Sequence, residues 1–109
     1  MAELRFYPVA STSELAEDEM KPVTIGKRTI ALYNVSGNYH ATEAFCSHGH
    51  ALLTDGYIEG EIVECPMHGG TFEIATGQPK GEPCTTALQT YPLRVEGDTI
   101  LIGIADDSA

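Results

Sequence analysis

Basic residues are scarce in this chain of 109 residues, which has six Lys and Arg against sixteen Asp and Glu and a formal net charge of -10. Nucleic acids and anionic membrane surfaces are bound chiefly through Lys and Arg, so this balance argues against both as partners. It allows docking to a basic patch on a protein partner, steered by electrostatic attraction. Negative charge that only keeps a small protein in solution is the alternative explanation.

Long apolar runs are also missing, since no stretch approaches the roughly 20 residues that a membrane-spanning helix needs. The start of the chain, Met1 to Arg5, does not combine basic residues with an apolar stretch, so no signal peptide is predicted. The chain has only three cysteines. An odd number of cysteines without a signal peptide indicates a reducing compartment. We therefore expect a cytoplasmic protein without membrane contact.

Turn signals are frequent, and the β-prone segments between them are short. With 42% hydrophobic residues, the chain 1–109 has enough for one domain with a modest core. The close spacing of strands, with turns such as the one at 36–38, predicts an all-β sandwich or barrel. Pro79 to Pro83 has two prolines and a glycine and is expected to be a rigid loop. Ser11 and Glu14 fit a capping box, and residues 105–109 are expected to form a flexible tail.

Two short segments hold thiols beside imidazoles. Cys46 and His48 are spaced C-x-H, Cys65 and His68 are spaced C-x-x-H, and sixteen residues (49 to 64) separate the pairs. Such spacing lets one loop present two side chains to a metal, and the intervening stretch is long enough to return as a hairpin. Two cysteines and two histidines can hold one zinc in a tetrahedron. They can also hold a [2Fe–2S] cluster in which two histidines replace two cysteines on one iron.

The distribution of ligand types favours the iron cluster. Structural zinc sites usually pair Cys with Cys and His with His, whereas each segment here carries one of each. That suits a cluster with Cys46 and Cys65 on one iron and His48 and His68 on the other. His50 offers a competing C-x-x-x-H spacing with Cys46.

The segments 46–49 and 65–70 resemble the C-x-H…C-x-x-H signature of Rieske iron–sulfur proteins. The resemblance extends from about Leu4 to Ile104. It is strongest to the small Rieske ferredoxins of bacterial aromatic-ring-hydroxylating dioxygenase systems. The runs at 53–60, 63–66 and 88–93, together with Thr76-Gly77, carry this second likeness.

The resemblance implies an antiparallel β sandwich or barrel of Rieske type with a cluster-binding subdomain, at about 45–72, inserted in it. It implies one Rieske [2Fe–2S] cluster, with His50 as an exposed neighbour of the site and Cys84 as a lone thiol. The implied ligands are Cys46, His48, Cys65 and His68.

The function that the resemblance implies is electron transport in aromatic hydrocarbon catabolism. The protein would be a one-electron carrier that accepts electrons from a flavin-containing ferredoxin reductase and passes them to the terminal oxygenase. It would be a component of the dioxygenase and not itself an enzyme. In agreement, no nucleophile–base pair, phosphate loop or nicotinamide fingerprint is evident in the sequence.

Differences from respiratory Rieske proteins predict a low reduction potential. The positions of their extra disulfide are Ala51 and Met67 here, and the positions of their serine and tyrosine hydroxyls are Gly70 and Phe72. Hydrogen bonds to sulfur stabilise the reduced cluster, so their loss predicts the low end of the Rieske range of about −150 to +300 mV. Six apolar residues near the site are expected to pack the two loops together: Phe45, Leu52, Leu53, Ile62, Met67 and Phe72.

Two alternatives stay open. The small Rieske-like subunit of an assimilatory nitrite reductase shares the expected fold and size, although the runs 55–57 and 88–93 favour the ferredoxin. A structural zinc module that only mediates contacts would be colourless and redox-silent.

Overall fold

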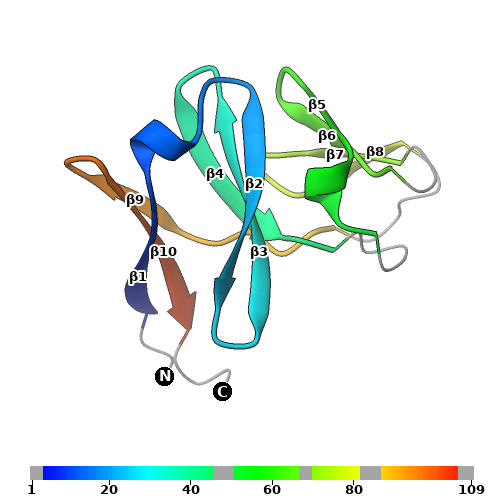
Figure 1. Ribbon diagram of the computed structural model, residues 1–109. Helices are drawn as coiled ribbons and strands as arrows, with labels where there is room; N and C mark the ends of the chain where they lie inside the picture. The colour runs from blue at the N-terminus through cyan, green and yellow to red at the C-terminus, as the bar shows by residue number, and fades with distance from the viewer. Residues whose placement is uncertain (1–3, 46–50, 67–69, 82–86, 106–109) are drawn as a thin grey trace.

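The computed structural model describes residues 4–45, 51–66, 70–81 and 87–105. These residues form three antiparallel sheets (Figure 1), which confirms the predicted all-β fold. Within these ranges the helices are two single 3-10 turns, neither of which has the length and hydropathy to cross a membrane.

The first sheet joins the two ends of the described chain. β1 (Leu4–Ser11) pairs with β10 (Thr99–Ala105), which pairs in turn with β9 (Leu93–Glu96). The register of β1 shifts between Pro8 and Ala10. Because proline lacks the N–H that a sheet ladder uses, such an irregularity is expected at an edge strand.

A capped turn follows β1, as the sequence predicts. In η1 (Thr12–Glu14), the Ser13 N–H donates to Oγ of Ser11 at 3.3 Å, and the Ser11 N–H donates to Oε2 of Glu14 at 3.0 Å. Lys21 donates a hydrogen bond to the Glu14 carboxylate at 2.9 Å, which lowers the pKa of Glu14. The capping box therefore orients the chain between the first two sheets.

The second sheet is the middle layer in Figure 1. It contains β2 (Glu19–Ile25), β3 (Arg28–Val35) and β4 (Asn38–Glu43), in that order. All residues of β3 from Ile30 to Val35 are buried, because both faces of this sheet are covered. Alternate residues of the strand serve two cores: Ile30 and Leu32 face β10, and Ala31 and Tyr33 face the third sheet.

The third sheet follows the first candidate ligand segment. It has the order β5 (Tyr57–Glu59), β6 (Ile62–Glu64), β7 (Thr71–Glu73) and β8 (Pro79–Gly81), and η2 (Leu53–Asp55) precedes it. β8 corrects the expectation of a rigid loop at 79–83, because residues 79–81 pair with β7. A proline is tolerated there since β8 lies at the edge of the sheet.

Candidate iron–sulfur centre

Cys65 is the one predicted ligand that falls among the described residues. Cys46, His48 and His68 lie outside them, as do His50, Met67 and Cys84. The parts of the chain that the structure describes, which include one of the four predicted ligands, contain no group of three or more potential metal-ligating side chains. The ligand set therefore stays a prediction, and the described residues around it show how the site is framed.

The second ligand segment is framed by β6 and β7. Cys65 follows β6 directly, and its N–H donates to the carbonyl oxygen of Gly70 at 2.8 Å. One residue farther out, Glu64 is paired with Thr71. These two pairings hold the main chain before residue 66 against the main chain after residue 69, directly beside Cys65.

The first ligand segment is framed in a similar way. Phe45 and Leu52 form an isolated antiparallel bridge, and the Leu53 N–H donates to the carbonyl oxygen of Ala44 at 2.8 Å. The turn η2 follows at once, and the Gly56 N–H closes it on the carbonyl oxygen of Leu53 at 2.9 Å. These bonds hold together the chain on either side of residues 46–51.

The chain that follows the first ligand segment contacts the chain around Cys65 at Gly56. A Cβ built on Gly56 would lie closer than 3.0 Å to the carbonyl oxygen of Glu64 and to Cδ of Pro66. The chain that returns from the first segment therefore packs directly on the residues that flank Cys65. This agrees with the expectation that the intervening hairpin brings the two segments together.

Cys65 is 2% exposed and belongs to an apolar core that spans the second and third sheets. Fully buried side chains in that core include Tyr33, Leu53, Val63 and Phe72. A thiolate at such a dry position suits an iron–sulfur cluster, because thiolates are the ligands such clusters prefer and the apolar surroundings limit access of water. No buried side-chain N or O atom among the described residues lacks a hydrogen-bond partner. The burial and the chemistry of Cys65 fit a thiolate ligand of a [2Fe–2S] cluster.

The six apolar residues that were expected to pack the two loops together differ in their burial. Leu53 and Phe72 are fully buried, as expected, and Leu52 and Ile62 are half-buried. The expectation is wrong for Phe45, whose side chain is 44% exposed. Successive residues of an extended chain point to opposite faces, so the burial of Ala44 turns Phe45 outward. Met67 lies outside the described residues.

A buried pair of hydroxyls was missed by the sequence analysis. The hydroxyl oxygen of Tyr33 lies 2.8 Å from Oγ1 of Thr42, which donates its own proton to the carbonyl oxygen of Glu43 at 2.9 Å. Since a threonine hydroxyl has a single proton, Tyr33 donates to Thr42. Burial raises the pKa of Tyr33 to about 12. Nothing in the sequence pattern identified the two hydroxyls as partners, because they come from neighbouring strands, β3 and β4.

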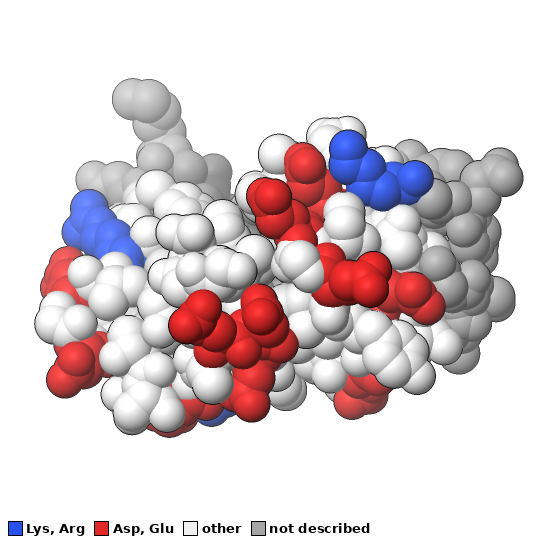
Figure 2. Space-filling view, turned by 90° about the horizontal axis from the view of Figure 1, so that it is seen from above, with Lys and Arg blue, Asp and Glu red and all other residues white. Residues whose placement is uncertain are grey.

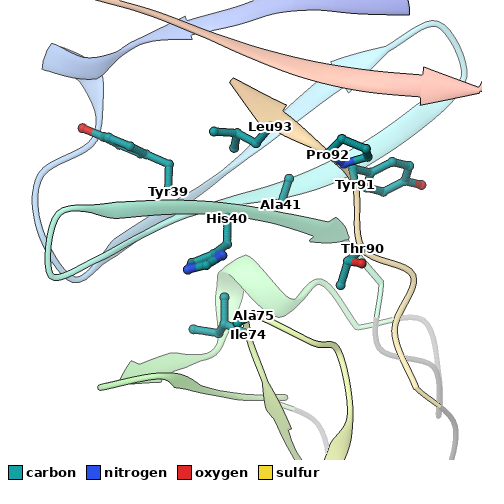
Figure 3. Close-up of a pocket in the computed structure, with 9 residues that line it drawn as sticks. All are labelled: Tyr39, His40, Ala41, Ile74, Ala75, Thr90, Tyr91, Pro92 and Leu93. Carbon is teal, nitrogen blue, oxygen red and sulfur yellow. The ribbon is translucent and has the colours of Figure 1, made fainter. Parts of the chain in front are cut away.

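Two hollows lie among the described residues. The first hollow has a volume of about 520 Å³ and lies between β4 and the turn that follows β7. The imidazole of His40 points into this hollow, toward Ile74 and Ala75 (Figure 3). The other, of about 470 Å³, lies on the outer face of the third sheet and is lined by Tyr57, Glu59 and Glu64 among others. Cys65, the predicted ligand among the described residues, lines neither hollow.

Comparison with known proteins identifies the family. The model of the Rieske [2Fe–2S] domain matches residues 5–92. The ferredoxin component of the naphthalene 1,2-dioxygenase system of Pseudomonas aeruginosa is 38% identical over 92 residues, which cover 84% of this chain and 88% of that protein. The other curated relatives include the ferredoxin subunit of an anthranilate 1,2-dioxygenase of Burkholderia cepacia, 35% identical over 91% of this chain and 92% of that protein.

Solved structures agree. A ferredoxin of Sphingomonas yanoikuyae B1 is 39% identical, with a TM-score of 0.87 over 92% of this chain and 99% of that one. In a complex of reduced oxygenase and oxidized ferredoxin of carbazole 1,9a-dioxygenase, one chain is 33% identical, with a TM-score of 0.85 over 89% of this chain and 91% of that one. A nitrite reductase small subunit of Mycobacterium tuberculosis has a TM-score of 0.82 at 18% identity, which is a likeness of fold alone.

These relatives confirm the predicted resemblance to Rieske ferredoxins, the Rieske-type β fold and the single [2Fe–2S] cofactor. They are ferredoxin components of oxygenase systems, in agreement with an electron carrier that is not itself the oxygenase. From the family model and the curated relatives together, the chain belongs to the Rieske [2Fe–2S] domain family.

Proposed function

We propose that this chain is the ferredoxin component of an aromatic-ring-hydroxylating dioxygenase system and carries single electrons from a flavin-containing reductase to the terminal oxygenase. The observation that carries this proposal is full-length likeness to stand-alone ferredoxins: 99% of the Sphingomonas yanoikuyae ferredoxin is covered at 39% identity. The complex of oxygenase and ferredoxin supports a terminal oxygenase as the electron acceptor.

The proposed ligands are Cys46 and Cys65 on one iron and His48 and His68 on the other. When bound, the cluster would supply a centre that accepts and releases one electron. The burial of Cys65 and its N–H bond to Gly70 support a ligand role, because both fix the thiol in one place. Apolar neighbours such as Leu53 and Phe72 keep water away from this side of the site.

We place the ligands in a cluster-binding subdomain at about 45–72 of a single domain, 1–109. The tail expected at 105–109 does not include Ala105, which pairs with Leu4 at the end of β10, and residues 106–109 lie outside the described residues. The bridge between Phe45 and Leu52 and the pairing of β6 with β7 support the subdomain. Its core is shared with β3, which supports a single domain. We place the protein in the cytoplasm, as the odd cysteine count indicates.

The surroundings of Cys65 support a low reduction potential. Gly70 and Phe72 have no hydroxyl, and both are buried. Tyr33 has one in the same core, but its proton is donated to Thr42. With few donors for cluster sulfur, the reduced and more negative form gains little stabilisation. Such a carrier suits delivery of electrons to an oxygenase.

The surface suits a basic partner. Acidic side chains outnumber basic ones on the face shown in Figure 2, in line with the net charge of -10. On the outer face of the third sheet, Tyr57 pairs with Glu64, and Ile62 lies between Glu59 and Glu73. A carrier that alternates between two proteins needs a small, transient interface, and attraction between opposite charges raises the rate of each encounter.

A reconstituted system tests the proposal. The chain is mixed with a flavoprotein ferredoxin reductase, NADH and the terminal oxygenase of an aromatic-ring dioxygenase, and oxidation of the aromatic substrate is followed. We expect turnover that depends on the chain and rises with its concentration. A chain that carries its cluster, fails to support any such oxygenase and co-purifies with a sirohaem subunit would contradict the proposal.

A further inference from the structure

We propose that Gly56 is a positioning residue for the second ligand segment: the lack of a side chain at Gly56 sets where Cys65 lies. This inference rests on the proposed function, because it takes Cys65 as a cluster ligand. The atoms nearest to a Cβ on Gly56 belong to Glu64 and Pro66 and not to Cys65 itself. Gly56 acts through the two residues on either side of Cys65.

The contact is a close approach of main chain to main chain. A Cβ on Gly56 would come within 3.0 Å of the carbonyl oxygen of Glu64 and within 3.2 Å of its carbonyl carbon. It would also lie 2.9 Å from Cδ of Pro66. Real Cβ atoms essentially never approach other atoms below 3.0 Å. Any residue with a Cβ at this position must therefore displace the main chain of residue 56 or of residues 64–66.

Neither side can yield freely. Gly56 is tied to η2 by its N–H bond to Leu53, whose side chain is fully buried. On the other side, Val63 is fully buried, and the Cys65 N–H is bonded to Gly70. Because a close-packed core transmits a displacement instead of absorbing it, a shift at Glu64 would move Cys65 and Gly70 together.

A second glycine in the same hairpin offers a matched control. Gly60, in the turn between β5 and β6, has φ +58, and a Cβ added there would meet nothing within 4 Å. Glycine is favoured at position 60 because of the positive φ and not because of a close contact. Asparagine tolerates positive φ better than most other residues with a Cβ. Gly60→Asn thus adds a side chain to the hairpin without steric contact, whereas Gly56→Ala adds one methyl group in contact.

The test compares Gly56→Ala, Gly60→Asn and the wild type as purified holoproteins. We expect Gly56→Ala to lower the affinity for the cluster about 10-fold, the scale seen when groups that orient metal ligands are changed. Iron and sulfide retained after brief exposure to a chelator report this loss. The cluster that remains should show shifted g values in the EPR spectrum of the reduced protein. Amide hydrogen exchange of a peptide that contains residues 64–71 should be faster, and Gly60→Asn should match the wild type in all three.

Each outcome decides a different claim. If Gly56→Ala kept the wild-type cluster retention, g values and exchange, the inference would be overturned. Loss of the β-sheet signal of the whole chain in circular dichroism would also overturn it, because the proposed effect is confined to the cluster site. If the wild type itself held no iron and sulfide, the proposed function would fail. The exchange of the 64–71 peptide would then still show whether Gly56 positions this segment.

Discussion

The hydroxyl oxygen of Tyr33 lies 2.8 Å from Oγ1 of Thr42, inside the core that also contains Cys65. The pair joins β3 to β4 on the face of the middle sheet that packs on the third sheet. Burial raises the pKa of Tyr33 to about 12, so the neutral, donating form is maintained in the folded protein. The burial of Tyr33 therefore makes stability sensitive to alkaline pH.

Tyr33→Phe should remove part of the alkaline sensitivity. The folded pKa lies above the ordinary value of 10, so this contribution is fully present below pH 10 and is lost as the pH rises toward about 12. It amounts to at most ~2.7 kcal/mol, from 1.36 kcal/mol per pKa unit. Urea unfolding from neutral pH to about pH 11 measures it, and the variant should be about 1 kcal/mol less stable at neutral pH. Equal pH slopes in the two proteins would contradict the role given to Tyr33.

His48→Ala and His50→Ala should separate the ligand from its neighbour. We expect His48→Ala to lose the EPR signal of a histidine-ligated cluster, because one iron loses a nitrogen ligand. His50→Ala should keep both the signal and the iron content. The reverse result would assign the ligand to His50 and the spacing to C-x-x-x-H.

Leu53→Ala should destabilise the protein by about 2–5 kcal/mol, since it empties a fully buried position in the core around Cys65. Its N–H bond to Ala44 is made by the main chain and survives the substitution. Leu4→Ala is the control, because that side chain is 51% exposed and should change stability by no more than about 0.5 kcal/mol. Urea denaturation of the holoproteins measures both, and equal effects would refute the packing role.

Electron transfer to the oxygenase should slow as salt is added. With a net charge of -10, encounter with a basic partner is accelerated electrostatically, and screening removes that gain. We expect the second-order rate constant, measured by stopped flow, to fall about 10-fold or more between low and high ionic strength. The reduction potential, recorded under both conditions, controls for a change in driving force. A rate constant that did not change with ionic strength would show that the net negative charge contributes to solubility and not to the encounter with the partner.

Local chemistry explains which parts of the fold could be predicted. Ser11 and Glu14 cap η1 as expected, because a capping box depends only on residues within one turn. The hairpin turn at Ser36 and Gly37 was expected for the same reason, and both residues have positive φ. The edge strand at Pro79–Gly81 was not, because its pairing with β7 overrides the weak strand preference of proline and glycine.

The types of ligand residue could be predicted from the sequence, but the contacts that position the ligand segments could not. The spacing of cysteines and histidines is a property of the sequence, so the cofactor class could be inferred and is confirmed by the family. The close approach of Gly56 to Glu64 depends on how η2 packs against β6, which no local pattern encodes. The outward turn of Phe45 likewise depends on which neighbour takes the core position.

The most direct test of the account is the iron, zinc and acid-labile sulfide content of the purified protein, together with its EPR spectrum after reduction with dithionite. The account predicts two irons and two sulfides per chain, the composition of one [2Fe–2S] cluster, and the low average g value of a histidine-ligated centre. One zinc per chain, no sulfide and no EPR signal would contradict it and would favour a structural zinc module.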